Sequence, residues 1–265
     1  MPKGVKAKGV KVWPLLTGTI RYEKKISTHG RGHGEFIDAP ILAYLIATPN
    51  GRILYDVGCD YRKVSNPGLQ AQYFYPMRPT VEPPKMGDEQ RIPRYLARLG
   101  LCSSDIDVVF VGHLHFDHVG GLCELPDCEV HVHADELAAA HTGMDGSVFK
   151  DELADATRWH LTTGEYTVTT GIRAVASPGH TAGHMSLFIE LQKGSPIILC
   201  GDAADLSENL SEEIAPGCCW QDNQALALTS IRKLKSLAAR EKAELWPNHD
   251  MAFYRGLPQF PAWRD

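Results

Sequence analysis

Short apolar runs that end in glycine, aspartate or histidine recur along this chain, and they predict a series of β-strands. The run at 106–112 is apolar at nearly every position, which is typical of a strand that is buried on both faces. Two runs at 41–47 and 52–56 flank a Pro-Asn-Gly turn, as the strands of a hairpin do. The remaining predicted strands are 129–133, 171–176, 185–191, 196–200 and 244–246.

Apolar residues at helical spacing predict helices at 88–99, from Ala134 onward and at 224–240. The last helix is the clearest, because its leucines and isoleucine recur on one face. Strands and helices alternate in two successive sets, so we predict an α/β fold with two sheets in the middle and helices outside. No linker interrupts the 265 residues, and a single domain over 1–265 is therefore predicted.

A polar and aromatic segment at 60–85 separates the strand at 52–56 from the first predicted helix. It is longer than a normal connection, so it is either functional or mobile. Its aromatic residues Tyr73, Phe74 and Tyr75 are candidates for a substrate pocket, with packing in the core as an equal alternative.

The composition is that of an ordinary globular protein, and the net charge of -5 argues against a nucleic-acid partner. No window approaches the roughly 18 apolar residues of a membrane span, and no signal-peptide core is present, so we expect a cytoplasmic protein without membrane contact. The seven cysteines form no Cys-x-x-Cys pair, and we expect most of them to be buried small apolar residues. A solvated N-terminal tail, rather than a docking patch, is predicted around Lys3, Lys6, Lys8 and Lys11.

The densest group of chemically active residues follows the predicted strand at 106–112. In an extended stretch His113 and His115 project to the same side, so their imidazoles can share one metal ion. Asp117 and His118 lie beyond the strand end and can turn toward a second ion. The glycines at 120–121 allow the backbone to turn closely around such a site.

Three further candidate ligands each follow another predicted strand: His180, Asp202 and His249. Together with the first group they supply enough ligands for two ions, with positions left open for a substrate. Imidazole and carboxylate without thiolate favour zinc, with iron, cobalt or manganese possible. Asp202 is suited to lie between two ions about 3.5–4 Å apart, as carboxylates do in two-metal hydrolases.

The other histidines have weaker patterns, because a single histidine after a strand is usually a satisfied polar residue. His131 and His133 alternate on a strand and are predicted to be structural. His184 either supports a ligand or is structural, and Asp56 is a candidate carboxylate that orients a ligand. Surface or hydrogen-bonding positions are predicted for His29, His33, His141 and His160.

The His-x-His-x-Asp-His segment, with the later His180, Asp202 and His249, resembles the metallo-β-lactamase superfamily. This resemblance implies an αββα four-layer sandwich with the site at one edge of the two sheets. It also implies a division of the ligands, with Asp202 bridging. One metal would be bound by His113, His115 and His180, and the other by Asp117, His118 and His249.

Within that superfamily the chain is similar to the N-acyl-homoserine lactonases from about Val10 to His249. The similarity includes the segments Leu-Tyr-Asp-Val-Gly at 54–58, Thr-Gly-Glu-Tyr at 163–166 and the stretch 177–190. It implies hydrolysis of a lactone, above all an N-acyl-homoserine lactone, by a hydroxide shared between the two ions. Asp117 would be both ligand and proton shuttle, and a homodimer is possible by resemblance.

One departure concerns the substrate. Such lactonases usually carry a tyrosine three residues after the bridging aspartate, whereas this chain has Asp205 there. A charged carboxylate cannot donate a hydrogen bond to an oxyanion, so either another group does so or the substrate differs. Asp205 is a candidate for binding a cationic or hydroxylated substrate group, with a solvated loop aspartate as the alternative. Phe116 is a candidate for the acyl-chain pocket, or for core packing.

Other activities use related ligand sets. Hydrolysis of a different lactone, amide or ester is the main alternative, because of Asp205. A glutathione-thioester hydrolase and a nuclease would need further domains, and a β-lactamase would need an export signal. A mononuclear iron dioxygenase would differ in metal count and identity, and a scaffold protein would not be expected to keep every ligand.

Overall fold

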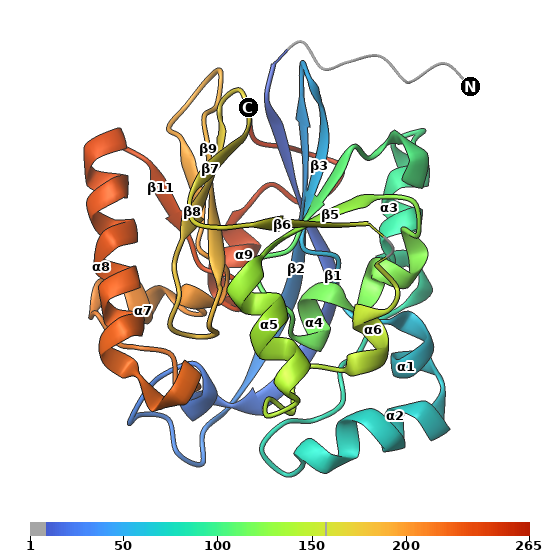
Figure 1. The fold of residues 1–265 in the computed structure, drawn as a ribbon, viewed down its shortest axis with the longest axis vertical. Coiled ribbons are helices and arrows are strands. Elements are labelled where there is room, and N and C mark those ends of the chain that lie inside the picture. Colours follow the sequence, from blue (N-terminus) through green and yellow to red (C-terminus); the bar gives the residue numbers. More distant parts are fainter. Residues whose placement is uncertain (1–8, 157) are drawn as a thin grey trace.

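Two β-sheets lie face to face in the computed structural model, with helices on the outside (Figure 1). The model describes residues 9–156 and 158–265. Its strands are β1 Lys11–Glu23, β2 Phe36–Thr48, β3 Gly51–Tyr55, β4 Val108–Phe110, β5 Glu129–His133, β6 Trp159–Thr162, β7 Tyr166–Thr169, β8 Ile172–Ala176, β9 Met185–Ile189, β10 Ile197–Leu199 and β11 Glu244–Trp246. Its α-helices are α1 Tyr61–Ser65, α2 Pro67–Phe74, α3 Ile92–Arg98, α4 Phe116–Val119, α5 Ala134–Thr142, α6 Lys150–Leu153, α7 Ser207–Ser211, α8 Gln224–Glu241 and α9 Met251–Gly256.

Strand direction brings several strand ends to one edge of the sandwich. The first sheet has the order β1-β2-β3-β4-β5-β6, and β3 to β6 run parallel to one another. The second has the order β11-β10-β9-β8-β7. Both β8 and β10 are antiparallel to β9, and β11 is parallel to β10, so β8, β10 and β11 share one direction. The predicted ligands follow β4, β8, β10 and β11.

Successive residues of β2 are buried on opposite faces of the first sheet, and each face is covered by a different layer. On β2, Leu42, Tyr44 and Ile46 pack in the core between the sheets, whereas Ala43 and Leu45 pack under the outer helices. Both faces are therefore covered, which explains the continuous apolar run. The opposite outer layer is α8, which covers the outer face of the second sheet, and the αββα sandwich is confirmed (Figure 1).

Three strands were not predicted, namely β1, β6 and β7. In β1 the apolar alternation is broken by Pro14 and by a register shift between Leu16 and Gly18, which hides the strand in the sequence. The predicted strand at 106–112 is shorter, because only Val108–Phe110 pairs as a strand. Helices also fail to alternate with strands in the second sheet, where β7 to β10 follow one another directly.

One predicted helix differs in detail, and two short helices in the segment 60–85 were not predicted. The helix predicted at 88–99 is a 3-10 turn at Asp88–Gln90 followed by α3. The segment 60–85 contains α1 and α2, whose first turns are capped by the side chains of Asp60 and Asn66. Short capped helices leave little periodicity to recognise in a sequence.

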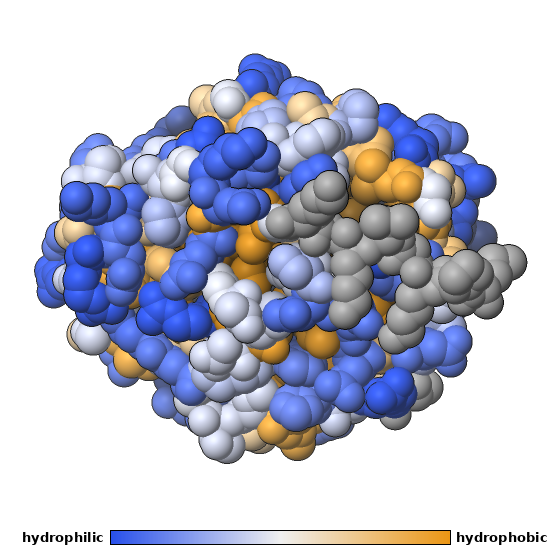
Figure 2. Space-filling model, turned by 90° about the horizontal axis from the view of Figure 1, so that it is seen from above, coloured by the Kyte–Doolittle hydropathy of each residue, from blue (hydrophilic) through white to orange (hydrophobic). Residues whose placement is uncertain are grey.

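Surface features agree only partly with the predictions. Three of the seven cysteines are buried, so the expectation that most would be buried is wrong. Lys11 belongs to β1 rather than to a tail, and Lys3, Lys6 and Lys8 lie outside the described residues. No described helix is long and apolar enough to cross a bilayer. Figure 2 shows a largely hydrophilic face on which hydrophobic groups form small, separate patches.

Close backbone approach at the turn after α4 generates a stability prediction. A Cβ added to Gly121 would overlap the carbonyl group of Val57, whereas one added to Gly146 would meet nothing within 4 Å. We therefore expect Gly121→Ala to lower the free energy of unfolding by about 1–3 kcal/mol. Gly146→Ala is the matched control, with a change of less than about 0.5 kcal/mol. Denaturant unfolding measures both, and equal stability of the two variants would contradict this packing.

Candidate metal centre

The predicted ligands converge at the edge where the strand ends meet, and all seven are buried. His113 and His115 lie in the loop after β4, and Asp117 and His118 lie on α4. The others follow separate strands of the second sheet: His180 after β8, Asp202 in a 3-10 turn after β10, and His249 after β11.

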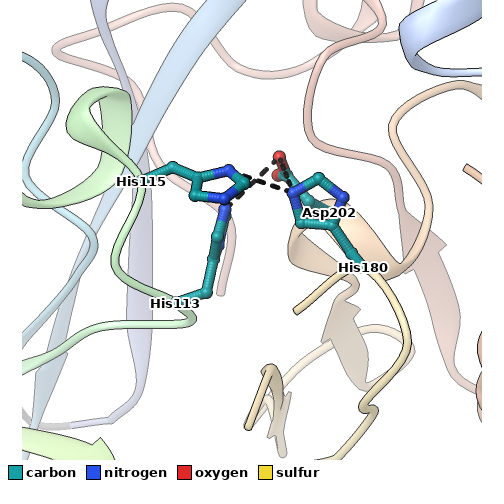
Figure 3. Close-up of side chains that lie close together, drawn as sticks. All are labelled: His113, His115, His180 and Asp202. Atoms are coloured by element: carbon teal, nitrogen blue, oxygen red, sulfur yellow. Dashed lines mark hydrogen bonds and ion pairs between the residues drawn. The ribbon is translucent and has the colours of Figure 1, made fainter. Parts of the chain in front are cut away.

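The donor atoms form two sets. In the first set, one ligand atom each of His113, His115, His180 and Asp202 lies within 4.8 Å of the others (Figure 3). The second set consists of Asp117, His118 and His249, by the same criterion. This is the division of ligands that the resemblance implied.

Asp202 lies between the two sets. Its Oδ2 is 3.7 Å from Nε2 of His113 and 3.6 Å from Nε2 of His180. The same oxygen is 3.2 Å from Nε2 of His249, and Oδ1 is 3.4 Å from Nε2 of His118. One carboxylate thus faces imidazoles of both sets, as a bridging ligand must.

Two observations indicate that these side chains can hold metal ions. Both ring nitrogens of His113 and Nε2 of His118 are buried without a hydrogen-bond partner in the described part of the chain. Buried polar atoms rarely remain unpaired unless another group satisfies them. In addition, ligands about 2.0–2.2 Å from a tetrahedral ion lie about 3.3–3.6 Å apart, close to the separations around Asp202.

Asp56 directly follows β3 and orients His118, a member of the second set. Its Oδ2 is 2.8 Å from Nδ1 of His118, and its Oδ1 accepts a hydrogen bond from the Gly112 N–H at 2.8 Å. The residue adopts a left-handed backbone conformation with φ 57°, which is uncommon for a residue other than glycine. The predicted role of Asp56 in supporting a ligand agrees with this geometry.

Two supporting carboxylates were missed in the sequence. Asp145 lies 2.9 Å from Nε2 of His115, so Nδ1 of that ring faces the first set. Glu136 accepts hydrogen bonds from the N–H groups of Leu114 and Gly183 at 3.1 and 2.8 Å, and so ties two ligand loops together. No local motif marks either residue, because their partners are distant in sequence.

Two further predicted ligands, His180 and His249, are oriented by carbonyl groups. Nδ1 of His180 is 3.1 Å from the carbonyl oxygen of Cys218, and Nδ1 of His249 is 2.9 Å from that of Pro40. Both rings therefore turn Nε2 toward Asp202. The backbone N–H of Asp202 in turn donates to Nε2 of His184 at 3.0 Å, which places His184 in a supporting position.

Electrostatics shift the pKa values of the clustered histidines in different directions. Burial and neighbouring histidines lower the pKa of His180 to about 4 and that of His113 well below its usual value. Burial raises the pKa of Asp202, but His249, His118 and His113 outweigh it, and the net shift is downward. Burial lowers the pKa of His249, but Asp202 outweighs it and raises the value to about 10. His113 and His180 are therefore neutral and ready to bind a cation, whereas His249 carries a proton that a cation bound there must displace.

A cavity of about 660 Å³ opens onto the two sets. Phe116 lines it, as predicted, and also stacks on Phe149 with ring centroids 5.1 Å apart, so the pocket and packing roles coincide. Tyr73, Phe74 and Tyr75 do not line this cavity, so of the two alternatives predicted for them the pocket role is wrong. Phe74 packs in a hydrophobic cluster with Phe116 instead. Apolar lining comes from Ile20, Ile26, Met77 and Val81.

Asp205 lines the same cavity and is 2% exposed, so the alternative of a solvated loop aspartate is wrong. Ser27 Oγ donates a hydrogen bond to its Oδ2 at 2.6 Å. Burial and the Asp202 carboxylate raise its pKa to about 7, and they outweigh His249 and the Ser27 hydrogen bond, which lower it. Ser27 is distant in sequence and was not predicted.

The other histidines take the structural positions that were predicted. His131 hydrogen bonds with Tyr166 and Glu129, and His133 accepts a hydrogen bond from the N–H group of Gly164 at 2.9 Å. Exposed positions are occupied by His29, His33, His141 and His160.

Comparison with known proteins agrees with this geometry. The family model described as the metallo-beta-lactamase superfamily matches residues 37–249. The chain belongs to this superfamily. A match of this extent includes every strand end that carries a predicted ligand.

Two relatives of this chain are both named N-acyl homoserine lactonase. An N-acyl homoserine lactonase from Bacillus sp is 34% identical over 228 residues, which are 86% of this chain and 88% of that protein. N-acyl homoserine lactonase AttM from Azorhizobium caulinodans is 25% identical over 274 residues, with 97% of this chain and 99% of that protein covered.

Solved structures resemble this superfamily member along its length. One is an N-acyl homoserine lactone hydrolase with the product N-hexanoyl-L-homoserine at its catalytic metal centre, with a TM-score of 0.86 and 28% identity over 98% of this chain and 100% of that one. Another is an AiiA variant from B. thuringiensis with N-decanoyl-L-homoserine at its active site, with a TM-score of 0.87, 28% identity and the same coverage.

The contact between Asp56 and His118 generates a prediction on metal affinity. Asp56→Asn keeps the shape and tolerates the left-handed backbone, but it removes the charge that supports His118. We expect about 10- to 100-fold weaker metal binding, measured by competition with a chelator. Asp127→Asn, at an exposed position, is the control with unchanged affinity. Equal affinity of the two variants would refute the supporting role.

Proposed function

We propose that this protein is a metal-dependent lactonase that opens the ring of N-acyl-homoserine lactones. The observation that carries the proposal is the placement of both donor sets, joined by Asp202, at one end of a partly apolar cavity. The names of the relatives and the product-bound neighbour point to the same substrate class. The cavity volume falls within the usual range for small-molecule sites, about 300–1,000 Å³.

We propose two zinc ions as the resident metals, since imidazole and carboxylate donors without thiolate favour zinc. The first would be held by His113, His115 and His180, and the second by the set of Asp117, His118 and His249. Such ions lower the pKa of water toward about 7 and polarise a carbonyl oxygen. The cytoplasmic location and the homodimer stay predictions from the sequence.

Asp117 is proposed to move the proton in ring opening. Addition of water to a lactone forms a bond to the carbonyl carbon and breaks the ring C–O bond, so a proton must reach the ring oxygen. The Asp117 carboxylate lines the cavity, and its oxygens lie 3.7 Å from His118 Nε2 and 3.6 Å from His249 Nε2. It can therefore accept the proton from water and pass it to the leaving oxygen.

The rest of the cavity is proposed to bind the acyl chain. The apolar side chains of Ile20, Ile26, Met77 and Val81 lie on β1, in the 3-10 turn that follows it and in the segment 60–85, away from the ligand loops. Phe116 joins them beside the second donor set. Burial of an acyl chain against these groups contributes roughly 0.8 kcal/mol for each methylene.

Turnover of acylated lactones is the first test of this proposal. We expect metal-dependent ring opening, followed by proton release, that stops when a chelator strips the protein and returns with zinc or cobalt. Simple aliphatic lactones, amides and aryl esters belong in the same panel, since a different lactone, amide or ester is the alternative substrate. If fully metal-loaded protein does not hydrolyse the acylated lactones but hydrolyses another substrate of the panel, the proposed specificity is refuted.

A substitution of Asp117 tests its proposed role in moving the proton. Asp117→Asn cannot carry the proton, so we expect kcat to fall about 100- to 10,000-fold, the usual contribution of general acid–base catalysis. Metal content must be measured in parallel by elemental analysis, because Asp117 is also a proposed ligand. A variant that holds two metal equivalents and retains full activity would show that another group moves the proton.

A further inference from the structure

Three hydrogen-bonded side chains, two of which line the cavity, lie beside the second donor set, and the proposed chemistry does not use them. The hydroxyl oxygen of Tyr22, on β1, is 2.7 Å from Ser27 Oγ. Ser27 Oγ donates to Asp205 Oδ2 at 2.6 Å. All three side chains are buried, and Tyr22 and Asp205 both line the cavity.

The hydrogen atoms fix the direction of these hydrogen bonds. A serine hydroxyl has one hydrogen, and Ser27 donates it to Asp205. The Tyr22 hydroxyl must therefore donate to Ser27, which leaves only its oxygen lone pairs for a ligand. Burial and the Asp205 carboxylate raise the pKa of Tyr22 well above its usual value, so the phenol keeps this proton.

Asp205 brings a second acceptor to the same wall. Its Oδ1 is buried and has no hydrogen-bond partner among the described residues. A buried carboxylate oxygen without a partner is unfavourable unless a ligand donates to it. Carboxylate and ring atoms of Asp202, Asp205 and His249 lie within 4.8 Å of one another, so the Asp205 carboxylate is next to the second donor set.

We infer that Tyr22 and Asp205 form an acceptor wall that binds a hydrogen-bond donor of the substrate, the N–H of an acylamino group attached to the lactone ring. The inference rests on the proposed function. A lactone carbonyl oxygen is repelled by this wall, so the ring is turned with its acylamino side toward Asp205. A hydroxyl group farther along an acyl chain lies several bonds from the ring and does not reach this position. Asp205 is thus a specificity-determining residue, and Ser27 positions it.

A pair of substrates tests the wall without any mutation. One is an N-acyl-homoserine lactone, and the other is the same molecule with CH₂ in place of its N–H. We expect the N–H compound to have a kcat/KM about 10- to 100-fold higher, the usual effect of a hydrogen bond to a charged group. Equal kcat/KM values would overturn the inference and leave the lactonase proposal intact.

Binding measurements keep the two proposals separate. Calorimetry compares N-hexanoylcyclopentylamine with the ketone that has CH₂ in place of its N–H, neither of which contains a lactone. Tighter binding of the amide supports the acceptor wall even if no lactone is turned over. Equal affinity overturns it, whatever the activity.

Three variants test whether Asp205 and Ser27 cause the difference in kcat/KM between the N–H and CH₂ substrates. Asp205→Ala is expected to bring the substrate ratio close to one, and Ser27→Ala to reduce it several-fold, with metal content unchanged in both. Asp127→Asn, at an exposed position outside this cavity, is the control that keeps the wild-type ratio. Loss of one metal equivalent in Asp205→Ala, with the wild-type ratio in Ser27→Ala, would overturn the inference and make Asp205 a metal ligand.

Discussion

The carboxylate of Asp202 is buried among imidazoles from three loops, and the arrangement of the site depends on this contact. A charge removed from water is costly unless opposite charges or cations lie beside it. Its two oxygens lie 3.2–3.7 Å from ring nitrogens of both donor sets. Only a fold that delivers several strand ends to one edge can collect these groups, and the parallel directions of β8, β10 and β11 do so.

A surrounding layer of hydrogen bonds fixes the rings before any ligand arrives. Carbonyl groups orient His180 and His249, while Asp56 and Asp145 orient His118 and His115. Each partner leaves the other ring nitrogen facing the donor sets. Preorganised groups need little rearrangement when a cation or substrate binds, which favours tight binding and fast chemistry.

The local part of this site could be predicted from the sequence, and the long-range part could not. His113 and His115 share a strand end, so their spacing alone indicates a common ion. Glu136 contacts Gly183, and Ser27 contacts Asp205 across 178 positions, and no local pattern encodes such contacts. The strand β1 was also missed, because its alternation of apolar and polar residues is interrupted. The acceptor wall could be recognised only once the structure had placed Tyr22 beside Ser27.

Anomalous diffraction at the zinc edge, on crystals of the zinc-loaded protein, tests the central claim most directly. The account predicts two peaks, one on each side of Asp202 and about 3.5–4 Å apart. One peak should lie among His113, His115 and His180, and the other between Asp117 and His249. A single peak, or two peaks that Asp202 does not join, would contradict a centre organised around this carboxylate.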